Sequence, residues 1–243
     1  MCPVPVCTSS QVIDGVTCHE VLRPSECESL HEKILGLRQV WTRRGESSVF
    51  FTLGAASYLD ATARDGNYHQ MAQRMNLVLQ QNFNWLYERL RAGFTGLLNA
   101  PVRYDATYAY PGFHIFDFRG DDQSDDQPGT RAHFDLQWMS VFPDLFPELK
   151  LSFTLSISEP TGGASLELWP LRMESAARTG IDALRFALAR DSTRITYVPG
   201  HMIVHDGLSL HAIGRSTIAR PEGHRITLQG HGAKANGQWT LYW

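Results

Sequence analysis

The hydrophobic period of the chain changes at Pro101, which separates a helical first part from a second part rich in strands. Between about residues 65 and 99, apolar residues recur every three or four positions, which predicts one long amphipathic helix. A shorter helix is predicted after Pro24, where Ser25 followed by Glu28 fits a capping box. A long apolar stripe needs a large apolar partner, and a sheet is the natural one.

Beyond Pro101 the pattern alternates with a period of two, as in half-buried strands. Strands are predicted at residues 113–118, 133–140, 149–157, 164–168, 194–198, 201–205, 210–214, 225–230 and 238–242, and a helical insertion at 173–189. Short antiparallel strands in such number favour a jelly roll. The predicted fold class is α+β, with a double-stranded β-helix (jelly roll) core over residues 101–243 and mainly helical support over residues 1–100. Residues 1–243 are expected to form a single domain.

Composition and charge narrow the class of protein. Apolar residues make up 43% of the 243 positions and charged residues 19%, which is compatible with a packed core. A net charge of −3 and a pI near 6.4 give no electrostatic footprint for nucleic acid. There is no uncharged apolar run of bilayer length, and the first residues lack the basic start and apolar stretch of a secretory signal. We therefore expect a cytoplasmic protein with no membrane partner.

All four cysteines, Cys2, Cys7, Cys18 and Cys27, lie in the first part of the chain. A zinc site would favour tight pairs such as Cys-x-x-Cys, and there are none. Free thiols in a reducing cytosol are the favoured interpretation.

Candidate metal ligands begin with His133-Phe134-Asp135, because residues two apart on a strand point to the same side. The pair alone carries little weight, since ten histidines and 25 acidic residues in 243 positions are enough to produce one by chance. His211 follows on another predicted strand, and Arg225 on the next. Two histidines and one carboxylate leave open positions on a metal, an arrangement that suits non-haem iron(II).

An ordered set of motifs strengthens this interpretation: His133-x-Asp135, Gly162-Gly163-x-x-Leu166, Pro199-Gly200, Leu210-His211 and Arg225-x-Thr227. Over roughly residues 113–232 the chain resembles the iron(II)- and 2-oxoglutarate-dependent dioxygenase superfamily. The resemblance implies a double-stranded β-helix, with His133, Asp135 and His211 as the iron ligands. Arg225, assisted by Thr227, would bind the distal carboxylate of the co-substrate 2-oxoglutarate.

The resemblance also implies the reaction. Iron(II), 2-oxoglutarate and O2 would together hydroxylate an unactivated C–H bond of a small-molecule substrate, releasing succinate and carbon dioxide. The protein supplies geometry and a dry cavity, while the metal supplies the difficult chemistry. A halogenase is disfavoured, because Asp135 occupies the ligand position that chloride would need.

Arg225 has a physical argument of its own. A planar guanidinium is the best match for a buried carboxylate, and Thr227, two residues on, would share its strand face. Ile226 and Leu228 alternate with this pair, so they would face the opposite side. A surface arginine on a strand is the competing interpretation.

Weaker assignments concern residues near the motifs. His114 is a candidate contact of the co-substrate, and Gln137 is a candidate pocket residue. His201 and His205 are expected to be core or supporting histidines rather than ligands. Trp138 and Tyr108 could bind substrate, but packing is the favoured role for aromatic residues in a barrel.

Two other functional classes stay open. A cupin-like metalloenzyme that does not use 2-oxoglutarate would need no buried arginine at position 225, and it would favour a His-x-His pair. A non-catalytic jelly-roll binding module would not need three aligned ligands. The sequence does not indicate an oligomeric state.

The segment 120–130, with Asp121, Asp122, Asp125 and Asp126, is too polar to pack. It is either a plain connector or a lid over the barrel mouth. As a lid, it would favour a small cationic or amine-bearing substrate, such as a free amino acid or a natural-product precursor.

Overall fold

The computed structural model describes residues 12–13, 15–44, 49–61, 68–118, 131–142, 147–214, 216–218 and 222–243. The helices are α1 (Pro24–Gly36), α2 (Ser57–Asp60), α3 (Tyr68–Leu98), α4 (Trp138–Val141), α5 (Met173–Thr179) and α6 (Ile181–Leu188), with a 3-10 turn η1 (Arg38–Val40). The strands are β1 (Val12–Ile13), β2 (Val16–Glu20), β3 (Thr42–Arg43), β4 (Phe50–Leu53), β5 (Val102–Tyr104), β6 (Gly112–Asp117), β7 (Leu149–Ser158), β8 (Ser165–Arg172), β9 (Thr193–Thr196), β10 (His201–His205), β11 (Ser209–Ile213), β12 (His224–Ala235) and β13 (Gln238–Tyr242).

These strands form two facing sheets. The large sheet has the order β1-β2-β10-β7-β12-β6-β4-β3, with β13 and β5 joined to it beyond β12, and the small sheet has the order β11-β8-β9. Among the described strands, all pairings are antiparallel except that of β13 with β5. The predicted α+β jelly-roll architecture is confirmed.

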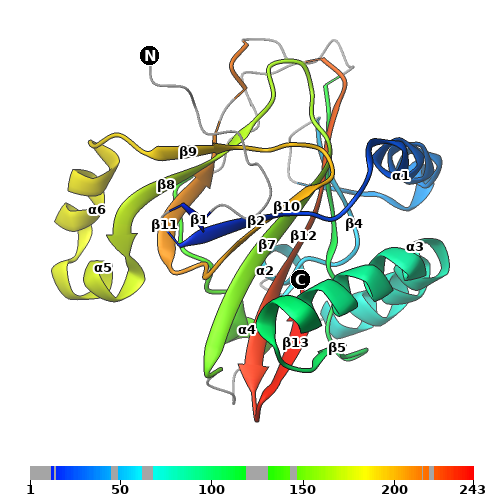
Figure 1. Cartoon of the computed structure of the whole chain (residues 1–243), viewed down its shortest axis with the longest axis horizontal. Coiled ribbons are helices and arrows are strands. Elements are labelled where there is room, and N and C mark those ends of the chain that lie inside the picture. The colour runs from blue at the N-terminus through cyan, green and yellow to red at the C-terminus, as the bar shows by residue number, and fades with distance from the viewer. Residues whose placement is uncertain are drawn as a thin grey trace.

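Apolar residues separate into layers. Helices α1 and α3 lie on one side of the large sheet, and the small sheet with α5 and α6 lies on the other (Figure 1). Alternate residues of β7 and β12, among them Phe153, Leu155 and Leu228, share one hydrophobic cluster with Phe83 and Phe94 of α3. The other face of these strands is therefore left to point between the sheets, where the polar residues of the chain can gather.

The long predicted helix is confirmed as α3, which is bent at Phe83 (φ −132°, ψ 21°). The predicted capping box of the first helix is wrong by two residues. Pro24 is the first helical residue, and the N–H of Arg23 donates to Glu26 Oε2 at 2.9 Å. A proline fits this first position, because its fixed φ is helical and no N–H is lost.

The strand predicted at residues 133–140 is wrong. Only His133 makes an isolated antiparallel bridge, with His211, and the segment then turns into α4. Trp138 and Val141, three residues apart, suit a helix face, and both belong to the cluster that contains Phe142 and Tyr242. Packing at helical spacing thus overrides the alternating pattern.

Three further differences from the sequence predictions concern the first hundred residues, the helical insertion and the cysteines. Strands β1 to β4 show that the first hundred residues also contribute to the large sheet. The helical insertion is two helices, divided at Gly180 (φ +71°). Cys18 is disulfide-bonded and Cys27 is free and buried, so the expectation of four free thiols is wrong and loses its force as an indication of a reducing compartment.

Of the described helices, none is both long enough and apolar enough to cross a membrane.

Candidate metal centre

His133, Asp135 and His211 converge at the rim of the space between the two sheets. One ligand atom from each lies within 4.8 Å of the others. His211 Nε2 is 3.3 Å from Asp135 Oδ2, and His133 Nε2 is 3.6 Å from Asp135 Oδ1. Adjacent ligands of an octahedral ion, each about 2.1 Å from the metal, lie about 3 Å apart. The three side chains therefore fit one face of a six-coordinate metal ion.

Hydrogen bonds fix which nitrogen each ligand imidazole offers. His133 Nδ1 donates to the carbonyl of Arg131, and His211 Nδ1 donates to the carbonyl of Ser209, both at 2.8 Å. Because Nδ1 carries the proton, the neutral ring presents the Nε2 lone pair toward Asp135. Carbonyl partners of this kind are the usual outer support of metal-bound histidines.

Backbone pairing brings the ligands together from distant segments. His133 and His211 exchange both backbone hydrogen bonds, at 2.8 and 3.0 Å. The Asp135 N–H donates to the carbonyl of Gly207 at 2.8 Å, in the turn between β10 and β11. Gly207 has φ +70°, and a Cβ there would lie 2.8 Å from Asp135 Cβ, so this turn needs glycine for two reasons.

The charges at the centre agree with a cation site. Burial alone would raise the pKa of Asp135, but the hydrogen bond and charge of His211 in its protonated form, with His231 and His205 nearby, hold it well below the usual range. Burial would likewise lower the pKa of His211, but the Asp135 carboxylate raises it above the usual value. Converging lone pairs beside an ionised carboxylate favour a positive charge among them.

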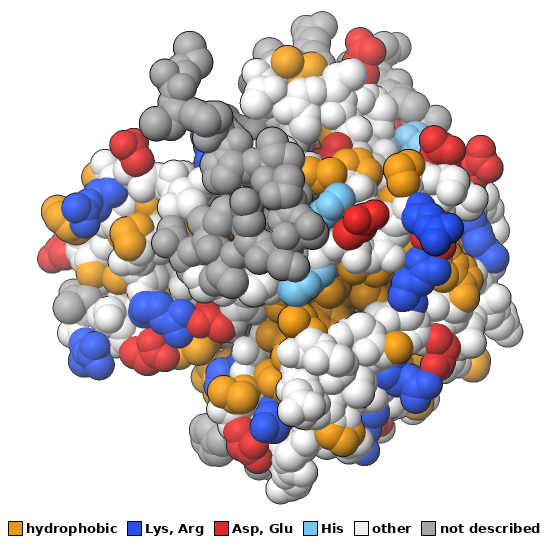
Figure 2. Space-filling view, in the orientation of Figure 1, with side chains coloured by type: hydrophobic (Ala, Val, Ile, Leu, Met, Phe, Trp, Pro, Cys, Tyr) orange, Lys and Arg blue, Asp and Glu red, His pale blue; other side chains and the backbone are white. Residues whose placement is uncertain are grey.

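A cavity of about 280 Å³ adjoins the three ligands. Its described lining is contributed by Tyr58, His114, Gln137, Ser152, Phe153, Thr154, Leu166, Tyr197, His205, Ile213, Gln229, Gly230 and His231. Seen in the orientation of Figure 1, the molecular surface has an apolar hollow bordered by charged and histidine side chains (Figure 2). The metal candidate thus lies at a small cavity rather than on a flat surface, as a reaction centre requires.

Arg225 and Thr227 lie on β12 in the same inward row as Gln229 and His231, which line the cavity. Arg225 is fully buried, and its Nε, Nη1 and Nη2 atoms have no hydrogen-bond partner among the described residues. Thr227 is fully buried as well, and its Oγ1 has no such partner either. Buried donors left in this way are rare in folded proteins and point to a ligand that is bound there.

Aromatic rings hold the guanidinium of Arg225. Its Cζ lies 4.9 Å from the ring centroid of Tyr197 and 5.7 Å from that of Phe116. Thr227 stands directly opposite His114 on β6. Both Tyr197 and His114 line the cavity, so Arg225 and Thr227 lie just behind its wall. Ile226 and Leu228 face the helix layer, as the alternation predicts.

His114 is buried at the cavity, where its Nε2 forms a short hydrogen bond with the Tyr58 hydroxyl and its Nδ1 has no described partner. Burial, with the nearby positive charges of Arg225 and Arg44, lowers the pKa of His114 well below its usual range. The ring is therefore neutral and can offer a hydrogen bond at Nδ1 without bringing a charge.

The remaining candidates divide between cavity and packing. Gln137 lines the cavity and donates to Asp135 Oδ1 at 3.3 Å. His205 also lines it, whereas His201 does not. Trp138 and Tyr108 pack against the cluster of Val141, Phe142, Ala233 and Tyr242.

Among the neighbours of the site that were not anticipated from the sequence are Tyr58, His231 and Glu159. His231 continues the alternation of Arg225, Thr227 and Gln229, and that spacing is a signal that could have found it. Tyr58 comes from the short helix α2, and Glu159 follows the end of β7. No motif marks either residue.

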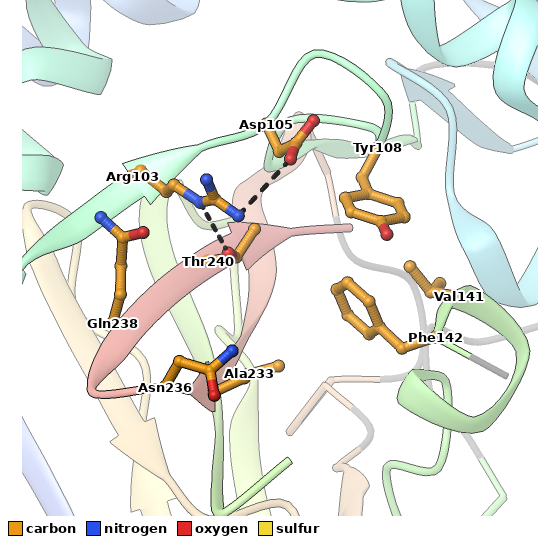
Figure 3. Close-up of a pocket in the computed structure, with 10 residues that line it drawn as sticks. Arg103, Asp105, Tyr108, Val141, Phe142, Ala233, Asn236, Gln238 and Thr240 are labelled. Carbon is orange, nitrogen blue, oxygen red and sulfur yellow. Dashed lines mark hydrogen bonds and ion pairs between the residues drawn. The ribbon is translucent and has the colours of Figure 1, made fainter. Parts of the chain in front are cut away.

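A larger cavity, of about 570 Å³, lies beside the β12–β13 hairpin. Its walls carry Arg103, joined to Asp105 and Thr240, opposite the rings of Tyr108 and Phe142 (Figure 3). It contributes none of the residues of the metal cluster. Size alone therefore does not identify the site, and the metal-ligand cluster favours the smaller cavity.

The acidic segment 120–130, predicted as a connector or a lid, lies outside the described residues.

No protein-family model and no curated protein matches this chain. Solved structures do match in fold. One is an N-substituted L-amino acid dioxygenase from Burkholderia ambifaria, in complex with α-ketoglutarate (2-oxoglutarate), at 19% identity and a TM-score of 0.55 over 94% of this chain and 86% of that one. Another is AviO1 from Streptomyces viridochromogenes, at 14% identity and a TM-score of 0.51 over 92% and 91%.

A third is SnoK, an α-ketoglutarate-dependent carbocyclase from nogalamycin biosynthesis, at 11% identity and a TM-score of 0.50 over 94% of this chain and 92% of that one. Likeness at such identities establishes the fold, which is the one that the sequence motifs led us to expect. It leaves the reaction of this chain to be argued from its own residues.

Proposed function

We propose that this protein is an iron(II)- and 2-oxoglutarate-dependent oxygenase that hydroxylates an unactivated C–H bond of a small molecule. One observation carries the proposal: a two-histidine, one-carboxylate cluster opens on a cavity, and just behind its wall lies a fully buried arginine whose guanidinium nitrogens have no hydrogen-bond partner among the described residues. The cluster suits an iron(II) ion with open positions. The arginine suits the distal carboxylate of a diacid.

Each residue has a definite task in this proposal. His133, Asp135 and His211 would hold the metal ion by one face, and their hydrogen bonds orient them in advance. Arg225 would receive the distal carboxylate, with Thr227 Oγ1 as a further donor. His114 Nδ1 would donate to or accept from a polar group of the co-substrate. Bound iron(II), with 2-oxoglutarate and O2, would supply the oxidising chemistry.

The competing classes fit these observations less well. A cupin-like enzyme without 2-oxoglutarate would not explain why the donors of Arg225 and Thr227 are buried with no hydrogen-bond partner among the described residues. A non-catalytic binding module would not explain why His133, Asp135 and His211 converge on one point. Both alternatives predict a protein that releases no succinate.

We propose a free amino acid or a natural-product precursor as the substrate. The cavity of about 280 Å³ suits a small molecule rather than a polymer chain. Among the fold relatives, one is an amino acid dioxygenase that binds α-ketoglutarate and another is a carbocyclase. The relatives thus include more than one reaction outcome, and product analysis must decide whether hydroxylation is the outcome here.

The test is an anaerobic iron(II)-loaded sample mixed with 2-oxoglutarate, a library of amino acids and related small molecules, and then O2. We expect O2-dependent succinate, and a product 16 mass units above one library member, the mass of the oxygen atom that hydroxylation adds. His211→Ala under the same conditions should release no succinate. Succinate at wild-type levels from that variant, or none from the wild type, would contradict the proposal.

A further inference from the structure

Arg225 has a carboxylate neighbour within the protein. Glu159, directly after β7, is anchored by Ser156, whose Oγ donates to Glu159 Oε1 at 2.7 Å. Its other oxygen, Oε2, lies 3.5 Å from Arg225 Nε. The exposed fraction of the side chain is 8% for Glu159 and 0% for Arg225. Two opposite charges are therefore buried side by side, behind the wall of the cavity.

This contact balances charge without forming a hydrogen bond. A buried guanidinium with no counterion would be strongly destabilising, so the protein needs an anion there while the cavity is empty. Neither Glu159 Oε2 nor any nitrogen of the guanidinium has a hydrogen-bond partner among the described residues. Glu159 therefore neutralises Arg225 and still leaves its donors available to an incoming carboxylate.

An incoming carboxylate changes the charge count. With the cavity empty, Arg225 and Glu159 sum to zero, and a bound anion on the same guanidinium would bring the total to −1. Like charges a few ångströms apart in a buried place are costly, and one proton on the Glu159 carboxylate restores the total to zero. Burial already raises the pKa of Glu159, although Arg225 and the Ser156 hydrogen bond act in the opposite direction. A second anion would raise it further.

We propose that Glu159 is the internal counterion of the co-substrate subsite, and that it takes up one proton from solvent when the distal carboxylate of 2-oxoglutarate binds Arg225. Glu159 is thus a positioning residue that tunes co-substrate affinity and makes it depend on pH. This inference rests on the proposed function, because it takes Arg225 as the carboxylate receptor.

The groups that face Glu159 are few in the described part of the chain. Arg225 faces it from β12, and Ser156 from β7. Tyr197, which follows β9, is the other titratable group coupled to it. Burial raises the pKa of Tyr197 to about 12, so it stays neutral and does not replace Glu159 as the proton acceptor.

The experiment is a calorimetric titration of 2-oxoglutarate into anaerobic iron(II)-loaded protein, in buffers of different ionisation enthalpy and at several pH values. The slope of observed enthalpy against buffer ionisation enthalpy counts the protons taken up. For the wild type we expect net uptake, and a Kd that rises with pH, because the bound state holds more protons than the free state.

Glu159→Gln keeps the shape and an oxygen for Ser156 but cannot take up the proton. We expect it to bind 2-oxoglutarate about tenfold more tightly at neutral pH, the scale of one removed like-charge contact. Its proton uptake should fall and its Kd should become flat with pH. Glu167→Gln is the matched control, since Glu167 pairs with Arg194 at 2.8 Å on the small sheet, and it should behave as the wild type.

A second measurement needs neither metal nor co-substrate. Ligand-free Glu159→Gln should unfold at a lower denaturant concentration than the wild type, because Arg225 then lacks its counterion, whereas Glu167→Gln should lose little. Equal proton uptake and equal Kd in wild type and Glu159→Gln would overturn the inference while leaving the proposed function intact. If the wild type does not bind 2-oxoglutarate, the proposed function fails, and ligand-free unfolding alone then decides the counterion role.

Discussion

Five histidines line the smaller cavity, and their hydrogen bonds separate ligands from non-ligands. The ligand candidates His133 and His211 donate from Nδ1 and leave Nε2 open. His205 does the reverse, because its Nδ1 accepts the Gly207 N–H at 3.1 Å, so its neutral ring carries the proton on Nε2. Burial, with the charge of His211, lowers the pKa of His205 to about 4, which keeps this ring neutral. Of the histidines His133, His205 and His211, only His133 and His211 therefore offer an imidazole lone pair to a metal ion at the cluster, in addition to the Asp135 carboxylate.

We predict that His133→Ala or His211→Ala loses bound iron(II) and remains folded, because the core of the protein lies in other residues. Iron content after equilibration with iron(II), and the circular dichroism spectrum, measure the two effects. His201→Ala is the control, since His201 lies on the neighbouring strand β10 outside the cavity lining, and it should keep wild-type iron content. Wild-type iron in either ligand variant would show that the ligand set is wrong.

We predict that Arg225→Ala weakens 2-oxoglutarate binding by about 3–5 kcal/mol, because a desolvated carboxylate then lacks its partner. Iron affinity should change little, since the guanidinium is not among the metal ligands. Titration of 2-oxoglutarate into the iron(II)-loaded variant measures the first effect, and metal content the second. The control is Arg194→Ala, which removes a half-exposed arginine on the small sheet. An unchanged affinity in Arg225→Ala would remove the argument for 2-oxoglutarate.

At the scale of elements, the sequence predicts regular alternation well and its interruptions poorly. The long strand at 149–157 and the helix α3 follow their period almost residue for residue. The predicted strand at 133–140 fails, because the ligand segment is held by two short backbone contacts, to His211 and Gly207, rather than by a ladder. The strands β2 and β4 are short and adjoin the sheet through distant partners, so no local pattern announces them.

The site shows the same division. Its ligand candidates occur in compact motifs, and the ordered set of motifs, with the family resemblance that it carries, brought His133, Asp135 and His211 together as a hypothesis. Tyr58 lines the cavity and Glu159 lies behind its wall beside Arg225, and both come from elements that carry no chemical motif, so their places depend on tertiary packing. A sequence thus reports the residues of a motif, but not the neighbours that set their charge.

The turn between β10 and β11 supplies an element-scale prediction. In Gly207→Ala, a Cβ would lie 2.7 Å from Ser152 Oγ and 2.8 Å from Asp135 Cβ, so Asp135 must move and iron affinity should fall at least tenfold, on the scale of lost ligand support. Gly237→Ala is a matched control, because Gly237 has a similar φ of +75° but nothing within 4 Å of the added Cβ. Both variants should lose some stability, on the order of 1–2 kcal/mol. Equal iron affinity in the two would contradict a role of Gly207 in placing Asp135.

At the scale of the whole molecule, the large sheet divides packing from chemistry. One face of β7 and β12 contributes Phe153, Leu155 and Leu228 to the helix-covered core. The opposite face contributes Ser152, Thr154, Gln229 and His231 to the cavity. The small sheet carries His211 and closes the other side (Figure 1). Stability and reactivity therefore depend largely on different residues of the same strands, and Phe153, which packs in the core and also lines the cavity, is where the two faces meet.

This division of the large sheet predicts that a mutation can lower the free energy of unfolding without lowering iron binding, and the reverse. Phe94 of α3 is fully buried, with its ring centroid 4.8 Å from that of Phe153. Phe94→Ala should lower the free energy of unfolding by about 3–5 kcal/mol, through lost burial and the cavity left behind. Leu77→Ala, on the same helix but 60% exposed, should change it by less than about 0.5 kcal/mol.

Iron content distinguishes this loss from a defect at the site. At a temperature where Phe94→Ala is still folded, we expect it to bind iron(II) as the wild type does, because its partners lie on the helix side of the large sheet. His211→Ala should show the opposite pattern, with iron lost and the unfolding free energy of the metal-free protein nearly retained. Denaturant unfolding and iron content, measured on the same four proteins, test both halves. If folded Phe94→Ala binds little iron, the helix layer also positions the metal ligands, and the separation of the two faces does not hold.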